Sequence, residues 1–476
     1  MAGDAPGRLA RREAIAAAAG SVAAVGALAA GIASLAPRTR RAGRKTVRFW
    51  HLLSGLWLEP LNRAVARFNE SQGRYEVDAL QLTTGEGDSK LLLSVAGGDP
   101  PDMMLVWSQI TSAWAASNII QPLDSFMTTG EMARFRTNAY PVVARSGWHH
   151  GQLYGITMGF DLFVVYYRPD LFRKAGIDPD RFPATLEEMD RLGDRINEFG
   201  SGGDLTRAGF LPQTLQYFIP LFGGNLYDAA TGRLTLNTPE NVRALTFMVE
   251  SRVRLGVETL RRRGNPVSTS TVEGRREALE SVTKFQAGLP GDDGASWPFI
   301  SGLYGMTIDG EWRVEQLRRY APQLEYRTIP VPPAAGGKRL ASFSMVNYLV
   351  MPKGARHPDG AWEFLKFWTG LDHPEVAAEM YPWQGWMPVL RASESAPVYQ
   401  SWLNTVPQYR TFLEVAKSDN IMTTPPVPYQ TFLMDRLSDI DQLAMRGTLT
   451  PEQALRKLED DVAHELARRK SLGLPE

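Results

Sequence analysis

The sequence predicts an α/β protein made of two lobes, each with a sheet covered by helices. Three observations lead to this fold class. Strands and helices alternate over residues 47–107, which is typical of a helix-covered, largely parallel sheet. An extended, glycine-interrupted stretch at 151–177 can cross from one sheet to another. The chain has 476 residues, which is too long for one ordinary core.

The first sheet begins at a short strand, Val47–His51, followed by a helix whose apolar positions fall on one face. Further strands are predicted at 75–82 and 102–107, separated by a helix at 90–96. In sheets of this kind, ligands bind at the carboxyl ends of the strands. The side chains expected there are Trp50, His51, Glu86, Trp107 and Gln109.

The stretch 151–177 contains two extended pieces. They meet at a break that includes Gly159 and one acid, Asp161. The β-branched and aromatic run 163–167 predicts a buried strand. A strand-turn-strand within one domain is the simpler interpretation. The flanking pattern favours a crossing between lobes, with a hinge near Gly159 and Asp161 at the edge of the cleft.

The second half of the chain repeats the mixed pattern with longer polar intervals. A short strand is predicted at 208–212, ending at Gln213, and the following segment contains Tyr217. Residues 261–300 are weakly patterned and are expected to form loops and a broken helix. A strand at 304–308 leads to Trp312, and an aromatic loop at 381–387 carries Trp383 and Trp386. Further elements are expected at 186–196 (helix), 347–351 (strand), 361–369 (helix), 425–428 (a proline-rich crossing) and 450–470 (amphipathic helix).

Composition excludes several classes of protein. There is no cysteine, so disulfides, thiolate catalysis and cysteine-based metal sites are excluded. Equal numbers of acidic and basic residues argue against a nucleic-acid binder. The six histidines show no metal-binding spacing, and no nucleophile elbow or phosphate loop occurs. No cofactor, metal or catalytic residue is therefore predicted, although 52 acids leave a glycosidase pair open.

The first 45 residues resemble a twin-arginine export signal. Arg11 and Arg12 precede an uncharged tract from Ala14 to Ala36, and five basic residues follow it. Cleavage after Ala33 is one expectation. The tract is also long enough to span a bilayer, so an uncleaved N-terminal anchor is the alternative. Both interpretations place the globular part outside the cytoplasmic membrane, in the periplasm or another extracytoplasmic space.

Aromatic and polar residues recur in loops after predicted strands. Each tryptophan taken singly suits a core as well as a ligand site. Together they suit a sugar site, because indoles stack on the C–H faces of a pyranose while amides and carboxylates bind its hydroxyls. The candidate ligand-binding residues are Trp50, His51, Glu86, Trp107, Gln109, Asp161, Gln213, Tyr217, Trp312, Trp383 and Trp386.

Several segments, taken in order, resemble the family 1 extracellular solute-binding proteins of ABC uptake systems. They are spread over most of the chain after the export signal. Two sequence features depart from the family pattern: Arg168 stands where asparagine is common, and the lipid-modified cysteine is missing. The matching segments are 63–73, 97–102, 153–155, 166–177, 223–228, 310–312 and 361–367.

The resemblance implies a periplasmic-binding-protein type II fold, with two lobes of mixed sheets joined by crossing strands. Lobe one would comprise residues 46–157 and 340–422, and lobe two residues 160–335 and 425–476. Trp312 matches a stacking aromatic of the second lobe, and Asp161 matches a polar contact on the crossing strand. Trp50, Glu86 and Trp107 would line the cleft from the first lobe, and Trp383 and Trp386 precede a segment that approaches the ligand.

The function expected from this resemblance is that of a non-enzymatic, monomeric receptor. It would capture a carbohydrate between its lobes, close by a hinge motion and deliver the sugar to an ABC permease in the membrane. Three alternatives stay open. One is a binding protein for a polyamine, phosphodiester or peptide, another is an exported carbohydrate-active enzyme, and the third is a sensor subunit.

Overall fold

The computed structural model describes residues 43–83, 86–291 and 294–475. The chain divides into Met1–Lys45 and a main unit, Thr46–Glu476, and the description below concerns the main unit. The predicted export signal and its apolar tract lie outside the described residues. Among the residues described, no helix combines the length and the apolar character that crossing a membrane requires.

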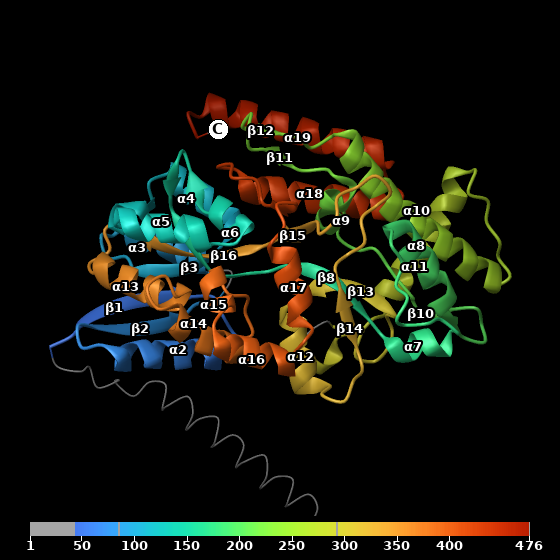
Figure 1. Ribbon diagram of the computed structural model, residues 1–476. Helices are drawn as coiled ribbons and strands as arrows, with labels where there is room; N and C mark the ends of the chain where they lie inside the picture. The colour runs from blue at the N-terminus through green and yellow to red at the C-terminus, as the bar shows by residue number, and fades with distance from the viewer. Residues whose placement is uncertain (1–42, 84–85, 292–293, 476) are drawn as a thin grey trace, which may run out of the picture. The chain divides into compact units, whose positions relative to one another are not determined.

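The larger sheet has six strands in the order β2-β1-β3-β16-β4, with β7 also paired to β16 (Figure 1). β1 runs parallel to β3. β16 runs antiparallel to β3, β4 and β7, so the sheet is mixed. The bounds are β1 Lys45–His51, β2 Tyr75–Gln81, β3 Met103–Trp107, β4 Ile120–Gln121, β7 Gly155–Phe160 and β16 Val346–Pro352.

Alternating side chains of β3 separate the two faces of this sheet. Met103 and Leu105 point into a core shared with helices α2 (Leu58–Ser71) and α13 (Pro358–Thr369). Met104 and Val106 point into a second core, with α3 (Gly87–Ala96) and α4 (Ser108–Ala116). The buried run of β3 is therefore apolar on both faces, as expected for a central strand covered by helices.

The smaller sheet has three antiparallel strands, with β8 (Phe163–Tyr167) between β13 (Met306–Gly310) and β14 (Arg327–Ile329). One face of β8 packs in a core with α8 (Leu186–Ile196), α10 (Pro239–Arg262) and α18 (Gln430–Met445). The other face, Val164 and Tyr166, belongs to the core that also serves the larger sheet.

The crossing predicted at 151–177 is confirmed. β7 pairs within the larger sheet, and β8 pairs within the smaller one. Asp161 and Leu162 are the residues that join them. Gly159 lies inside β7 opposite Asn347, where a Cβ would come within 3.2 Å of the Trp386 side chain. A parallel pair formed by β15 (Ser342–Ser344) and β17 (Ile421–Thr423) adds a second connection near this point.

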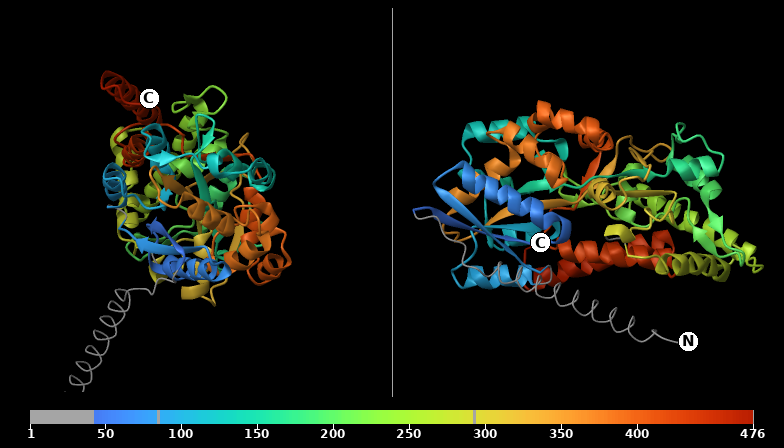
Figure 2. Two further views of the ribbon diagram at one scale, coloured as in Figure 1. Left: turned by 90° about the vertical axis from the view of Figure 1, so that its left-hand side faces the viewer. Right: turned by 90° about the horizontal axis from the view of Figure 1, so that it is seen from below.

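The remaining elements cover the sheets, and α18 and α19 lie side by side in both Figures 1 and 2. The other helices are α5 Thr129–Asn138, α6 Pro141–Arg145, α7 Pro169–Lys174, α9 Leu215–Phe218, α11 Val272–Ala287, α12 Trp312–Tyr320, α14 Pro374–Gln384, α15 Arg391–Glu394, α16 Pro397–Thr405, α17 Tyr409–Ala416 and α19 Pro451–Ser471. The 3₁₀ turns are η1 Gly55–Trp57, η2 Asp124–Phe126, η3 Ile219–Phe222 and η4 Gly294–Ser296. The small hairpins are β5 Trp148–His149 with β6 Gln152–Leu153, β9 Glu198–Phe199 with β10 Leu205–Arg207, and β11 Tyr227–Asp228 with β12 Arg233–Leu234.

Three local predictions are wrong. The short strand expected at 208–212 is not formed, because β10 ends at Arg207 and only Ala208 pairs, through an isolated bridge to Tyr304. The weakly patterned region 261–300 contains the long helix α11, whose Thr271 side chain caps the amide of Gly274 over 3.1 Å. Ala278, Leu279 and Val282 provide its buried face, a narrow stripe that the polar composition hides. The region 381–387, expected to be an aromatic loop, begins inside α14, which continues through Pro382 to Gln384.

The predicted lobe boundaries stay a prediction. The strands of the two sheets come from different parts of the chain in the manner that the boundaries require, because every strand of the larger sheet lies in 45–160 or 346–352. The cores, however, are continuous across the crossing.

Candidate functional site

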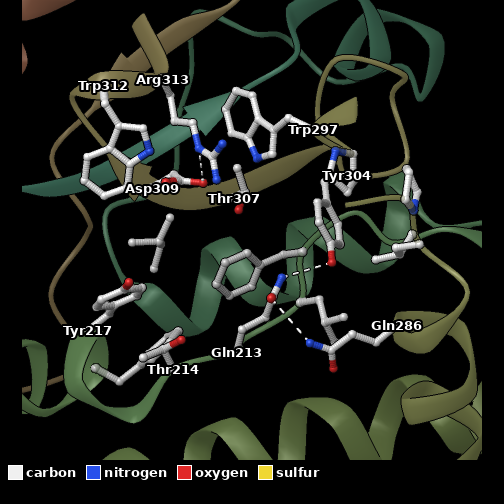
Figure 3. Close-up of a pocket in the computed structure, with 17 residues that line it drawn as sticks. Gln213, Thr214, Tyr217, Gln286, Trp297, Tyr304, Thr307, Asp309, Trp312 and Arg313 are labelled. Carbon is white, nitrogen blue, oxygen red and sulfur yellow. Dashed lines mark hydrogen bonds and ion pairs between the residues drawn. The ribbon is translucent and has the colours of Figure 1, made fainter. Parts of the chain in front are cut away.

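A cavity of about 390 Å³ opens between the smaller sheet and the helices α9, α11 and α12. One side is formed by β13 and the start of α12. The opposite side is formed by the segment leading into α9, and the end of α11 adds a third contribution. Figure 3 shows Trp312, Arg313 and Trp297 along the first side, with Gln213, Thr214 and Tyr217 facing them.

Aromatic rings hold one end of the cavity in place. Trp312 meets Phe163 edge-on, with ring centroids 5.6 Å apart. Tyr217 stacks on the same Phe163 ring at 3.9 Å. Phe163 itself is buried in β8. One core side chain thus fixes two half-buried rings, Trp312 and Tyr217, whose remaining surface borders the cavity.

Of the described residues that line the cavity, Asp309 and Arg313 carry charge. Arg313 Nε donates to Asp309 Oδ2 over 2.9 Å, and both side chains are largely buried. The guanidinium also lies over the ring of Trp297, 4.6 Å from its centroid. Because the two opposite charges form an ion pair, their charges offset each other at this wall.

A chain of side-chain hydrogen bonds runs along the opposite wall. Buried Arg252 donates to Gln286 Oε1 over 2.9 Å, and Gln286 Nε2 lies 3.4 Å from Gln213 Oε1. Gln213 Nε2 then donates to the Tyr304 hydroxyl over 3.0 Å. Arg252 also donates to the carbonyl of Pro212 over 3.1 Å. This series of hydrogen bonds fixes the orientation of the two side-chain amides. The guanidinium of Arg252 can only donate, so Gln286 must present its oxygen to Arg252 and its nitrogen to Gln213.

Three predicted ligand-binding residues, Gln213, Tyr217 and Trp312, line this cavity together. Asp161 and Trp386 lie elsewhere, beside the crossing. They border a much smaller cavity of about 10 Å³ that also includes Gly159 and Asn347. The indole of Trp386 stacks on Trp57, with ring centroids 5.6 Å apart, and only 8% of the residue is exposed.

The other candidates are distributed over the larger sheet and its helices. Trp107, at the end of β3, is 36% exposed, whereas His51 is buried. Burial lowers the pKa of His51 to about 4, against a raising hydrogen bond with the backbone of Leu53. The indole of Trp50 lies under Lys90, with Nζ 5.3 Å from the ring centroid.

Three candidates remain. Glu86 is exposed at the N-terminus of α3. Trp383 packs under Arg63, whose Cζ lies 4.3 Å from the ring. The side chain of Gln109 lies outside the described part of the structure.

Several cavity residues are absent from the predicted set, notably Trp297, Tyr304, Asp309 and Arg313. Asp309 and Arg313 flank Gly310-Glu311-Trp312, and their spacing of four residues is a sequence signal for an ion pair at the start of a helix. Trp297 and Tyr304 had no such signal, because they lie in and next to a region that was expected to be loops. The remaining lining residues include Thr214, Gln286 and Thr307.

With this geometry in place, comparison with known proteins identifies the family. Residues 55–372 match the family model of the bacterial extracellular solute-binding proteins. The chain belongs to this family. The predicted family is therefore confirmed, as is the prediction of a solute-binding protein.

Relatives and solved structures extend the match over most of the chain. The sn-glycerol-3-phosphate-binding periplasmic protein UgpB of Escherichia coli (strain K12) is 23% identical over 439 residues, covering 86% of this chain and 90% of the relative. CpMnBP1 with mannotriose bound has a TM-score of 0.71 at 23% identity, covering 87% of this chain and 99% of that chain.

The sugar-binding protein MalE from Xanthomonas citri has a TM-score of 0.67 at 21% identity, covering 90% of this chain and 99% of that chain. The similarity to these solved structures confirms the predicted fold class of type II periplasmic binding proteins.

Proposed function

We propose that this protein is the extracytoplasmic receptor of an ABC importer and that it captures a neutral carbohydrate in the cavity beside β13. The observation that supports this ligand most directly is the make-up of the cavity wall. Half-buried rings, Trp312 and Tyr217, stand next to amides and hydroxyls, and Arg313, which is the arginine among the described lining residues, is paired with Asp309. Indole faces stack on sugar C–H groups, and the amides bind hydroxyls.

The charge at the wall favours a neutral ligand over a phosphate. A phosphate needs donors whose charge is not already compensated, whereas the Arg313 guanidinium is held by Asp309 and Gln316. A phosphate-containing solute is the second candidate, because the curated relatives are named as sn-glycerol-3-phosphate-binding proteins.

We extend the ligand site to the larger sheet as part of the proposal. Trp50, Trp107 and Asp161 would approach the solute when the chain bends at the crossing. Solute that contacts both sheets would then favour the closed arrangement by its higher affinity for it. The closed receptor would dock on membrane permease subunits as a monomer. Light scattering on the purified protein would show the monomeric state.

A thermal-shift screen tests the ligand class. The ligands are mannobiose, mannotriose, maltotetraose, sn-glycerol 3-phosphate, putrescine and a tripeptide. A ligand present at 100 times its Kd stabilises the protein by about 2.7 kcal/mol. We expect an oligosaccharide to raise the Tm and sn-glycerol 3-phosphate to leave it unchanged. A shift with only the phosphate, the amine or the peptide contradicts the carbohydrate proposal.

Matched tryptophan variants test the cavity. Trp312→Ala should abolish the shift caused by the active sugar while the protein stays folded. Trp402→Ala is the control, because Trp402 on α16 packs at a tilt against Tyr399 and Tyr409, with ring centroids 5.1 and 4.8 Å away. It should lower the starting Tm and keep the shift. Equal loss in both variants would place the site elsewhere.

Two further parts of the proposal have separate tests. Chromatography of the sugar after incubation should return it unchanged, whereas a product would identify an exported enzyme.

N-terminal sequencing of the protein from cell fractions should show cleavage after Ala33 for a released receptor. An intact N-terminus in the membrane fraction would identify an anchored one.

A further inference from the structure

Two carboxyl groups meet where the chain passes from one sheet to the other. Asp161 follows the last residue of β7, and Glu311 directly follows β13 and precedes Trp312. The two side chains are hydrogen-bonded to each other. The amide of Leu162 donates to Glu311 Oε2 over 3.1 Å, and the amide of Asp161 donates to the carbonyl of Met345 over 3.0 Å. The pair therefore connects the crossing segment to the start of α12.

Burial prevents both carboxyls from being ionised together. Glu311 is 1% exposed, and Asp161 is partly buried. Burial, with the neighbouring charge of Asp161, raises the pKa of Glu311 well above its usual range. Burial raises the pKa of Asp161 to about 6, against the lowering effect of the hydrogen bond from Glu311. Two adjacent carboxyls in such a site are stable with one proton between them.

Among the residues that the structure describes, the titratable groups facing the pair do not supply a compensating positive charge. Asp309 on β13 lies close by and pairs with Arg313. The charge of Glu311 acts electrostatically on three phenols: Tyr166 on β8, Tyr399 on α16 and Tyr409 on α17. Burial raises the pKa of each phenol far above neutrality, so all three stay uncharged. The Tyr166 hydroxyl donates to the carbonyl of Gly310 over 2.7 Å.

We propose that Asp161 and Glu311 hold one shared proton, that this proton fastens the crossing segment to α12, and that its loss weakens the hold on the crossing and on Trp312. The second negative charge would sit against the first in a buried site, and the strands would separate to admit water. Glu311 thus acts as a positioning residue for the cavity, whatever solute the cavity takes.

The direction of the pH effect follows from the raised pKa values. The folded protein binds this proton more tightly than the unfolded chain does. The fastening is therefore complete at acidic pH and is lost as the pH rises through the folded-state pKa values. Solute binding should likewise weaken as the pH rises.

Hydrogen–deuterium exchange of the full-length protein, read by mass spectrometry on the peptide around Leu162, tests the proposal without a solute. After correction for the intrinsic rate, protection of the wild type should fall by up to about tenfold per pH unit as the pH rises from the ordinary carboxyl pKa towards the folded-state pKa of the pair, and should level off above it. In Glu311→Gln the amide can still accept from Leu162 and donate to Asp161, but it cannot titrate. Its protection should stay constant above the titration of Asp161 at about 6, up to about pH 9.

Two variants complete the experiment. Asp161→Asn removes the neighbouring charge but leaves the buried Glu311 to titrate, so it should move the loss of protection to a lower pH without flattening the profile, and it serves where Glu311→Gln is poorly folded. Asp441→Asn removes a different buried acid and should leave the exchange of this peptide as in the wild type. The proposal is overturned if wild-type protection does not change with pH, or if Glu311→Gln keeps the wild-type slope.

Discussion

The ring of Tyr217 stacks on the ring of Phe163, with centroids 3.9 Å apart. The two residues come from different elements, because Phe163 begins β8 and Tyr217 lies in α9. Phe163 also supports Trp312 edge-on. A residue of the core thus holds two rings of the cavity wall that lie far apart in sequence.

Phe163→Leu should therefore weaken binding indirectly, through the positions of the two rings that Phe163 supports. Leucine keeps the apolar volume approximately but has no flat face for Tyr217. We expect a loss of stability of about 1–2 kcal/mol and a loss of affinity for the active sugar of about tenfold. Calorimetric titration and urea unfolding measure the two effects. Unchanged affinity would show that the rings keep their positions without this support.

Gly310→Ala should displace Trp312. A Cβ built on Gly310 would overlap the indole of Trp312, so the ring must move away from the cavity. We expect sugar binding to be lost while the circular dichroism spectrum is retained. Gly73→Ala is the control, because nothing lies within 4 Å of a Cβ there. Retained binding in Gly310→Ala would mean that the indole is not a contact.

Asp441→Asn should change how stability depends on pH. Burial raises the pKa of Asp441 to about 7, against the lowering effects of the Leu215 amide and Arg252. An acid with a raised folded-state pKa stabilises the fold at low pH, and this contribution disappears between the unfolded and folded pKa values. The contribution of Asp441 to the free energy of unfolding of the wild type should fall as the pH rises from about 4 to about 7. Urea unfolding at several pH values should show a smaller fall in the variant, and an identical profile would contradict the assignment.

Lys366→Met should destabilise the larger sheet's side of the molecule without affecting binding. Lys366 Nζ lies 3.2 Å from carboxylate oxygens of Glu131, Glu363 and Asp372. Its side chain is 14% exposed. Removing the ammonium leaves these acids facing one another, at a cost of about 1–3 kcal/mol. The free energy of unfolding should fall, and the Kd for the active sugar should stay the same. A changed Kd would connect this cluster to the ligand site.

The sequence predicts the strands of this fold better than its site. The run 163–167 is apolar on both faces and could only be a buried strand, and Asp161 next to it was correctly placed on the crossing. The long helix α11 was missed because its buried stripe is narrow and its other faces are charged. Trp297 and Tyr304 were missed for a related reason: they reach the cavity through tertiary packing onto β13, which no local pattern of residues encodes.

The order of the strands also has a consequence for synthesis. β16 occupies the middle of the larger sheet, between β3 and β7, although it comes much later in the chain than either. Until the ribosome has released it, two neighbouring strand edges carry unpaired amides and carbonyls. Such edges are prone to pair with other chains, and long-range pairing of this kind is slow to form. In a nascent chain these edges therefore stay open to such pairing until β16, which ends at Pro352, has been made.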